Sequence, residues 1–501
     1  MDGSNLIGSF GYSYSFYLYF CTHMFSKAQT DILLSKIRDG IAMTGGEKLN
    51  LIALLSIPSI LAQVTNVMMF FIDQAMVGSL GAEAPAAIGL VESTIWLFGS
   101  LAGAISMGFS VQTAHFIGAN DFGKARDVVR HALVCCMSLS LFIMLTALCI
   151  SGPLPLWLGG GADIAPSAST YFLVFSLAIP FMQLNNLSSA MLKCEGNMRI
   201  SSMLSVVLCV LDVIFNFLLI FPTREVDFWG ITITIWGAGL DVMGAALGTA
   251  IAYVIISITQ AWFAFYRSEI LGIMRGTRSN FTNNFNWDYV RNAVKISAPM
   301  ALQSALMSGA QIVSTMIVAP LGNFAIAANT FAITAESLCY MPGYGIGDAA
   351  TTLVGQSIGA KRKELCRSFA RMTVFSGMVV MALMGVVMYV AAPQLMGLMT
   401  PIATIRDLGA DCLRIEAFAE PFFAASIVSY CVCVGAGDTF KPALMNLCSM
   451  WLVRLTLAGL LAKSYGLQGV WFAMAVELTF RGTIFLVRIF RGRWMKSITY
   501  E

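Results

Sequence analysis

Residues 56–81 read SIPSILAQVTNVMMFFIDQAMVGSLG, and this stretch decides the fold of the chain. It is apolar and long enough for a helix that crosses a lipid bilayer, which needs about 20 residues. Pro58 lacks a backbone donor and should bend that helix near its start. Asp73 places a carboxylate in the apolar run, where an unpaired charge costs roughly 2.5–3.5 kcal/mol on insertion scales. We therefore expect Asp73 to be neutral, paired or hydrated, and to be a functional residue.

The composition of the whole chain is that of a membrane protein. Of its 501 residues, 57% are hydrophobic and 11% are charged, whereas a soluble globular protein carries about 25% charged residues. The composition predicts an all-α integral membrane protein. The net charge of +3 is too small and too dispersed to indicate a nucleic-acid partner. The expected partner at this point is the lipid bilayer, with the chain acting as a monomer.

The sequence shows no convincing pattern for a catalytic or cofactor site. The 12 cysteines lie mostly inside apolar runs and lack the spacing of metal ligands. Residues 118–124 (GANDFGK) approach a phosphate-binding loop, but Ala125 stands where the loop needs Ser or Thr. No set of residues resembles the nucleophile and base of a hydrolase. We expect a protein that is not an enzyme and has no cofactor.

Twelve segments are predicted to cross the membrane. They are residues 49–78, 86–113, 127–152, 165–191, 197–221, 243–267, 289–319, 325–354, 368–392, 404–434, 440–462 and 467–490. The connectors alternate in charge, and the basic set includes Lys361, Arg362 and Lys363 as well as both flanks of the chain. By the positive-inside rule both termini face the cytoplasm, so we expect a multi-pass protein of the cell (inner) membrane.

An internal repeat organises these segments into two halves. An offset of 241 residues carries Pro58 onto Pro299 and Asp73 onto Ser314, and the alignment holds without a gap through the fifth span. Parallel repeats of this kind build transporters whose halves rock around a central cavity. The fold class is therefore twelve transmembrane helices in two pseudo-symmetric six-helix bundles. The predicted organisation is an N-terminal extension with an interfacial helix (1–46), a first lobe (47–267), a cytoplasmic linker (268–288), a second lobe (289–490) and a cytoplasmic tail (491–501).

Four polar residues are expected to meet in the first lobe. Asp212 and Asn216 lie four residues apart in the fifth span and share one helix face. The predicted topology places them, together with Asp73 and Thr249, in the outer half of the membrane. Two neighbouring carboxylates cannot both ionise cheaply, which indicates a proton site. With the oxygens of Asn216 and Thr249 the same group could hold Na⁺, and the alternative is a hydrogen-bonded packing network.

Other polar residues lie within the spans of both halves. Balanced signs favour structural ion pairs in the second lobe, with substrate contact or gating as the alternative. That set is Glu336, Asp348, Arg414, Glu416, Glu420, Arg454, Glu477 and Arg481. Four amides are candidates to line the first-lobe cavity, although single polar residues more often form plain interhelical hydrogen bonds. These are Gln63, Asn66, Asn185 and Asn186.

The motifs FIDQAMVGSLG (71–81), IGAND (117–121) and IGAKRKEL (358–365) resemble those of the MATE family of multidrug and toxic compound extrusion transporters. The resemblance covers residues 47–490 and implies secondary-active export, usually of cationic amphiphiles, driven by H⁺ or Na⁺. The DinF-like branch implies coupling roles for Asp73 and Thr249. In that branch Asn precedes Asp in the fifth span, whereas here Asp212 and Asn216 stand in the reverse order. The span-seven glutamate of the NorM-like branch is missing from residues 300–318.

Our hypothesis for such export is alternating access, with ion binding at the acidic pair and movement of the first span at Pro58. Two alternatives stay open. A flippase for lipid-linked oligosaccharide would need a strongly cationic cavity, and the few intramembrane arginines here are balanced by glutamates. An exporter of an endogenous metabolite is closer to the same plan.

Overall fold

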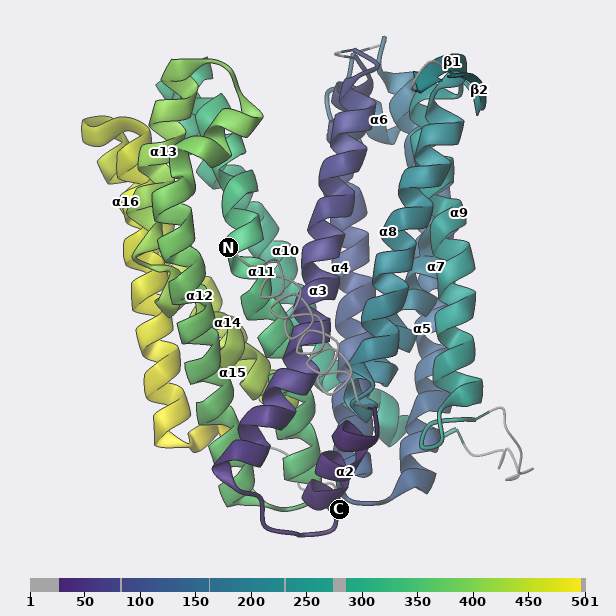
Figure 1. Ribbon diagram of the computed structural model, residues 1–501, viewed down its shortest axis with the longest axis vertical. Helices are drawn as coiled ribbons and strands as arrows, with labels where there is room; N and C mark the ends of the chain where they lie inside the picture. Colours follow the sequence, from purple (N-terminus) through teal and green to yellow (C-terminus); the bar gives the residue numbers. More distant parts are fainter. Residues whose placement is uncertain (1–26, 82, 162, 229–230, 274–284, 497–501) are drawn as a thin grey trace, which may run out of the picture.

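The structure, a computed structural model, describes residues 27–81, 83–161, 163–228, 231–273 and 285–496. Two upright helical bundles stand side by side in it (Figure 1). The first bundle, the first lobe below, and the short elements attached to it comprise α2 (Lys27–Arg38), α3 (Gly45–Gly78), α4 (Glu83–Gly118), α5 (Phe122–Ile150), α6 (Leu154–Trp157), α7 (Ala165–Glu195), α8 (Met198–Ile220), the strands β1 (Pro222–Phe228) and β2 (Ile231–Ala238), α9 (Asp241–Trp262) and a π-helical turn (Phe263–Arg267).

The second bundle, the second lobe below, repeats the plan of the first. Its elements are α10 (Trp287–Val318), a 3₁₀ turn (Ala319–Leu321), α11 (Asn323–Gly359), α12 (Lys363–Met399), α13 (Ala403–Ala417), α14 (Glu420–Gly435), α15 (Phe440–Cys448), a π-helical segment (Ser449–Arg454), α16 (Leu455–Arg491) and a 3₁₀ turn (Arg493–Lys496). The predicted stretches 1–26 and 497–501 and residues 274–284 of the linker lie outside the described residues.

The twelve predicted spans correspond to helices of the structure. Among the described residues, nine helices are long and apolar enough to cross a membrane, and α13 with α14, bent by 61°, makes a tenth. The helix α11 has 37 residues and is of comparable length. The segment 440–491 reverses at Gly466, whose φ of 59° and ψ of −140° are not helical, and thus forms two spans. The fold is all-α apart from the antiparallel β1–β2 hairpin, which was not predicted for the connector after the fifth span.

Two equivalent glycines bring the lobes into backbone contact. Gly118 ends α4 and Gly359 ends α11, and the repeat aligns them. A Cβ on Gly118 would lie 2.0 Å from the carbonyl oxygen of Gln356, and a Cβ on Gly359 would lie 1.9 Å from that of His115. Because His115 and Gln356 are themselves repeat mates, the two contacts are the same contact made in opposite directions.

Reciprocal hydrogen bonds repeat this relationship. The ring Nε2 of His115 lies 2.8 Å from the carbonyl oxygen of Gly435, and the Nε2 of Gln356 donates to the carbonyl oxygen of Cys194 at 2.8 Å. Gly435 and Cys194 also differ by 241 residues. A pseudo-twofold axis therefore passes between α4 and α11 where the lobes meet.

The lobes are joined near one end of the molecule, called here the α2 end, opposite the hairpin end that carries β1 and β2 (Figure 1). In the described part of the chain, the side-chain hydrogen bonds between the lobes reach from the α2 end only to the level of Gln63, about midway along α3. Beyond that level the two bundles diverge toward the hairpin end.

The predicted interfacial helix is α2, which lies across the α2 end below both lobes (Figure 1). Leu34 is buried in a hydrophobic cluster that also includes Leu51 of the first lobe and Phe369 of the second. Arg362 of the second lobe donates to the backbone oxygens of Lys36 and Ile41 at 2.9 Å each. This segment therefore ties the two lobes together at their closed end.

Candidate functional site

Asp73 reaches the site from the last part of α3. That helix contains Pro58, leans toward the second bundle in its first turns and then rises along the first (Figure 1). It packs on α8 and α11, so one helix contacts the ion-site candidates and the second lobe. A movement of α3 would therefore change the packing both at the ion-site candidates and at the second lobe.

Asn216 joins the two carboxylates of the first lobe. Its Nδ2 donates to Asp73 Oδ1 at 2.8 Å and to Asp212 Oδ2 at 3.2 Å. Asp212 and Asn216 are 0% and 1% exposed, and Asp73 is partly buried. The i, i+4 spacing on α8 puts both residues on one face, and the side chain of Asp73 comes to that face from α3.

The neighbouring helix α9 approaches this group closely. A Cβ on Gly248 would lie 2.1 Å from Asn216 Oδ1, so only glycine permits this packing. The next residue, Thr249, is within reach of the Asp212 carboxyl. The four residues singled out from the sequence are thus brought together between α3, α8 and α9.

Two tyrosines that the sequence did not single out flank the group. Tyr171 of α7 and Tyr253 of α9 are partly buried and lie near enough to Asp73 and Asp212 to interact electrostatically with both. Tyr253 lies four residues after Thr249 and therefore on the same face of α9, which is the signal that could have revealed it.

This arrangement offers oxygen atoms to a proton or a small cation. Within the described residues, Asp212 Oδ1 and Asn216 Oδ1 are buried without a hydrogen-bond partner. A buried acceptor without a donor is unfavourable by about 1–3 kcal/mol, and a proton on the carboxyl or a bound cation would remove that penalty. The oxygens of Asp73, Asp212, Asn216 and Thr249 are hard donors of the kind that Na⁺ accepts.

The second lobe holds a separate acidic cluster. Glu477 accepts a hydrogen bond from Ser449 at 2.6 Å and pairs with Arg481 at 3.2 Å, as their spacing predicts. Glu416 and Glu420 are fully buried, and in the described part of the chain their four carboxyl oxygens have no hydrogen-bond partner. Hence ion pairing accounts for only part of this cluster.

Some of the other charged residues predicted for the second lobe join this acidic cluster and others do not. Glu336 is buried beside Glu416, and Arg454 lies near both. Arg414 does not join the glutamates, because it pairs with Asp411 at 3.8 Å on the surface. The sequence groups Arg414 with the glutamates because it lies six residues before Glu420. In the structure the chain bends at the break between α13 and α14, which separates Arg414 from Glu420.

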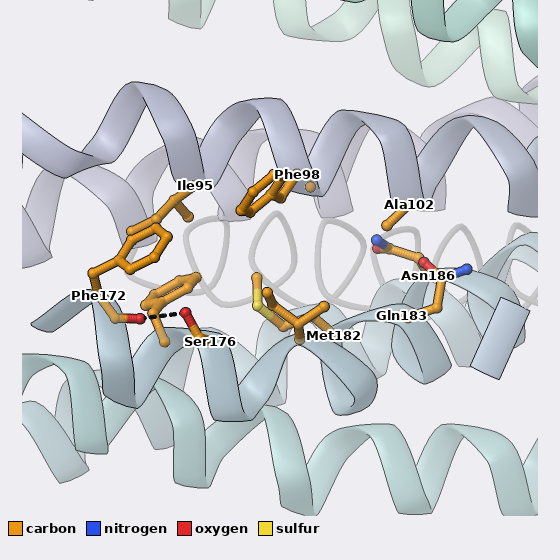
Figure 2. A pocket seen from close by; sticks show the side chains of 11 residues that line it. Ile95, Phe98, Ala102, Phe172, Ser176, Met182, Gln183 and Asn186 are labelled. Atoms are coloured by element: carbon orange, nitrogen blue, oxygen red, sulfur yellow. Dashed lines mark hydrogen bonds between the residues drawn. The ribbon is translucent and has the colours of Figure 1, made fainter. Parts of the chain in front are cut away.

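The four amides expected to line a first-lobe cavity are also distributed differently. Asn186, with Gln183, lines the polar end of a small cavity of about 30 Å³ between α4 and α7, whose walls include Phe98 and Phe172 (Figure 2). Such a volume holds about one or two water molecules. Asn185 has a buried Oδ1 that finds no hydrogen-bond partner among the described residues, whereas Asn66 is exposed.

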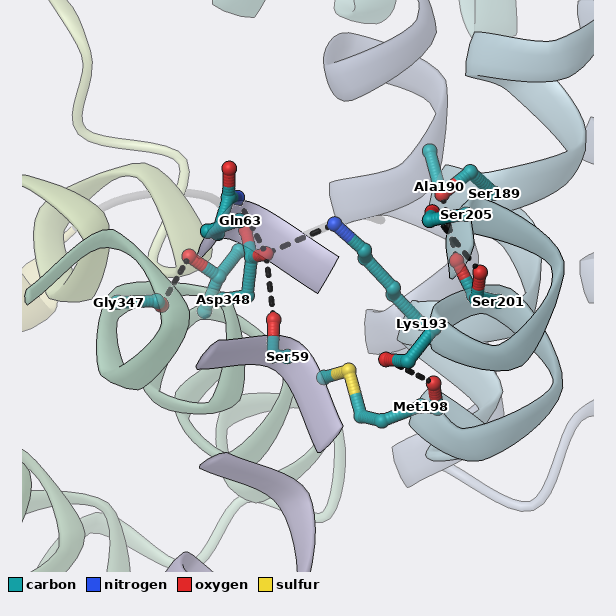
Figure 3. A network of polar contacts seen from close by, with 12 residues as sticks. Ser59, Gln63, Ser189, Ala190, Lys193, Met198, Ser201, Ser205, Gly347 and Asp348 are labelled. Atoms are coloured by element: carbon teal, nitrogen blue, oxygen red, sulfur yellow. Dashed lines mark hydrogen bonds and ion pairs between the residues drawn. The ribbon is translucent and has the colours of Figure 1, made fainter. Parts of the chain in front are cut away.

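Gln63 serves a different contact. Its Nε2 donates to Asp348 of the second lobe at 3.2 Å, so it joins the lobes rather than lining a cavity within one. Lys193 pairs with the same carboxylate at 2.7 Å (Figure 3). Sequence patterns gave no sign of this ion pair, since its partners lie 155 residues apart on α7 and α11.

The chain is similar to known proteins in both halves of its repeat. The MatE family model matches residues 58–218 and 299–460, one segment in each half of the repeat. Similar proteins include the probable multidrug resistance protein NorM of Thermotoga maritima, 24% identical over 88% of this chain and 92% of that one, and the uncharacterized transporter YisQ of Bacillus subtilis, 22% identical over 85% and 90%.

Solved structures share the fold. A MATE protein in the straight conformation superposes with a TM-score of 0.80 at 21% identity, covering 90% of this chain and 97% of that chain. A mutant of the Vibrio cholerae MATE transporter VcmN gives 0.79 at 17% identity, covering 93% and 98%. At these identities the likeness concerns the arrangement of the helices.

Proposed function

The chain belongs to the MatE family of membrane transporters, and we propose that it is a secondary-active antiporter that exports drugs or other amphiphilic, often cationic, compounds in exchange for H⁺ or Na⁺. The observation that supports this most directly is the Asp73–Asn216–Asp212 group. It combines two carboxylates, one bridging amide and two buried oxygens that lack hydrogen-bond partners in the described chain.

The orientation follows from charge. Basic residues gather at the α2 end, where Lys36, Lys193 and Arg362 lie, and the opposite connectors hold only Arg224, Arg406 and Lys463. The positive-inside rule makes the α2 end cytoplasmic in the cell (inner) membrane, with both termini on that side. Because the lobes are joined at the α2 end and diverge at the other, the conformation is outward-open.

Ion binding supplies the switch in this proposal. In the outward-open state Asp73 and Asp212 take up a proton or Na⁺, which removes a net buried charge. The change lets α3 repack at Pro58, and since α3 also packs on α11 the movement reaches the second lobe. The cargo is released outward as the cavity closes.

The available driving force sets the scale of export. One pH unit is worth about 1.36 kcal/mol for each proton. A membrane potential of 100 mV adds about 2.3 kcal/mol for each charge moved. One proton exchanged for a neutral compound could sustain roughly a 500-fold gradient, and exchanged for a monovalent cation about tenfold.

The test is efflux of a fluorescent cation from proteoliposomes under separate pH and Na⁺ gradients. Asp73→Asn should abolish gradient-driven efflux while the protein is still inserted and folded. Asp407→Asn is the matched control, because Asp407 is an exposed aspartate that pairs with Arg406 in the second lobe. Undiminished efflux by Asp73→Asn would rule out the coupling role.

A flippase for lipid-linked oligosaccharide fits the charges less well. It would require cations to hold a diphosphate, and Lys193, Arg454 and Arg481 each lie beside carboxylates. An exporter of an endogenous metabolite would use the same coupling site and differ in cargo alone, so a panel of cargo compounds in the same vesicles separates it from a drug exporter.

A further inference from the structure

Asp348 of α11 is the point on which several contacts between the lobes converge. Among the described residues, its Oδ2 accepts hydrogen bonds from Ser59 Oγ at 2.7 Å, Gln63 Nε2 at 3.2 Å and Lys193 Nζ at 2.7 Å (Figure 3). Ser59 and Gln63 lie on α3 and Lys193 on α7, so these three donors all belong to the first lobe. Figure 3 shows Lys193 reaching this carboxylate from the right, Ser59 from below and Gln63 from above.

The surroundings of the pair are closely packed and mixed in character. A cavity of about 20 Å³ beside it is lined by apolar residues of the first lobe, such as Met107 and Val111, and by the hydroxyl residues Ser110, Thr351 and Thr352. That volume holds about one water molecule. The side chains of Lys193 and Asp348 are 23% and 16% exposed, so the ion pair is shielded from bulk solvent in this conformation.

If the lobes separated at the α2 end, Asp348 would lose more of its polar contacts than the residues around it. The α11 carboxylate would lose its donors from α3 and α7 together, because they move with the other lobe. A partly buried, ionised carboxylate that has lost its donors is unfavourable without a counter-ion, so it would attract a cation from the newly opened cleft. Lys193, left on the opposite wall, would then be the group that competes with that cation.

We propose that Asp348 is a binding residue for the cationic group of the cargo when the α2 end opens, and that Lys193 is the built-in counter-ion that displaces this cation as the end closes. The ligand class is a monovalent organic cation, since the group that would lose its donors is a carboxylate, and the apolar side chains of Met107 and Val111 stand with Lys193 on the opposite, first-lobe wall of the cleft. The proposal rests on the proposed export function for its direction only. Binding to the opened site needs no ion gradient.

Counter-ion exchange and a purely structural ion pair differ in the expected effects of removing Lys193 or the charge of Asp348. If the pair only holds the lobes together, removing either partner should have the same effect. If Lys193 competes with the cargo, its removal should strengthen cation binding, because the competitor is gone and opening is easier. Removal of the Asp348 charge should weaken the same binding.

The experiment measures binding of tetraphenylphosphonium and tetraphenylborate, two ions of nearly equal size and opposite charge, to the full-length protein in nanodiscs. Lys193→Met should bind tetraphenylphosphonium about tenfold more tightly than the parent protein, and Asp348→Asn about tenfold or more weakly, the scale of one charge-assisted contact. Tetraphenylborate should show the opposite order, since Asp348→Asn leaves Lys193 without its counter-ion.

Asp438→Asn is the control, because Asp438 forms a partly buried ion pair with Arg488 inside the second lobe and should leave both affinities unchanged. Equal shifts for Lys193→Met and Asp348→Asn, or no tetraphenylphosphonium binding by any variant, would overturn the proposal. If either of these outcomes were found while efflux still depended on Asp73, the binding proposal would fail and the antiporter function would remain supported. Opposite shifts without any gradient-driven efflux would support the binding site and refute the antiporter.

Discussion

The side-chain amide of Asn216 on α8 donates a hydrogen bond of 2.8 Å to Asp73 on α3, although the two residues are 143 positions apart in the sequence. The same nitrogen lies 3.2 Å from Asp212, so one amide links two carboxylates inside the first lobe. Two carboxylates this close favour a shared proton or cation over two free negative charges.

The order of Asp and Asn on α8 should matter less than their presence. In the double variant Asp212→Asn with Asn216→Asp, the same face still carries one carboxylate and one amide, and we expect gradient-driven efflux to persist. Asn216→Leu removes the bridging donor, a charge-assisted hydrogen bond worth about 1.5–3 kcal/mol, and efflux should fall about tenfold or more. Vesicle efflux measures both. An inactive double variant that remains folded would show that the order itself is required.

Thr249 should distinguish Na⁺ from H⁺ as the coupling ion. Thr249→Val keeps the shape of the side chain and removes an oxygen that Na⁺ could use, whereas a proton on Asp73 or Asp212 needs no such ligand. We expect efflux driven by a Na⁺ gradient to fall about tenfold, the effect of losing one good ligand contact, and efflux driven by a pH gradient to persist.

The control for that variant is Thr259→Val on the same helix, where the hydroxyl only donates to Ile255 at 2.8 Å on an exposed face. It should leave both modes of efflux unchanged. Equal losses in both modes for Thr249→Val would mean that its hydroxyl supports the site without selecting the ion.

Gly118 should be intolerant of a side chain. In Gly118→Ala the added methyl would meet the backbone carbonyl of Gln356, which cannot yield as a side chain can. Overpacking of this kind lowers the free energy of unfolding by about 1–3 kcal/mol. Thermal unfolding of the purified protein should show the loss.

Gly103→Ala on the same helix is the comparison for Gly118. Among the described atoms, a Cβ there would meet nothing within 4 Å, and replacing a helical glycine with alanine stabilises by roughly 0.5–1 kcal/mol. If both variants melted at the same temperature, the close approach of α4 and α11 in this conformation would not contribute to stability.

The α2 segment should stabilise the closed α2 end. Leu34→Ala removes a buried side chain from the cluster shared by both lobes and should favour separation at that end. Cys194 is buried there, with its carbonyl bound by Gln356, so its labelling by a maleimide should become about tenfold faster or more. Mass spectrometry of the labelled peptide separates it from the other cysteines.

Ile32→Ala tests whether that effect belongs to the buried face of α2. Ile32 lies on the same helix and is 59% exposed, so its removal should leave the labelling rate unchanged. If Leu34→Ala also left the rate unchanged, α2 would be a passive attachment.

The sequence by itself determined the number of spans and their grouping into two lobes. Apolar length is a local property, and an offset of 241 residues can be found by comparing the chain with itself. The same offset relates Gly118 to Gly359, and the structure shows that these mates make equivalent contacts. The spacing of Asp212 and Asn216 fixed their common face, because the period of a helix does so without reference to its neighbours.

Contacts between helices were decided only by the tertiary structure. Arg414 turns to Asp411 instead of the buried glutamates, Gln63 reaches the second lobe, and Lys193 finds Asp348. Each outcome depends on how a helix is rotated, bent or tilted against another. Hydropathy and spacing along one helix carry no information about that rotation, so the partner of a polar side chain is set where two helices meet.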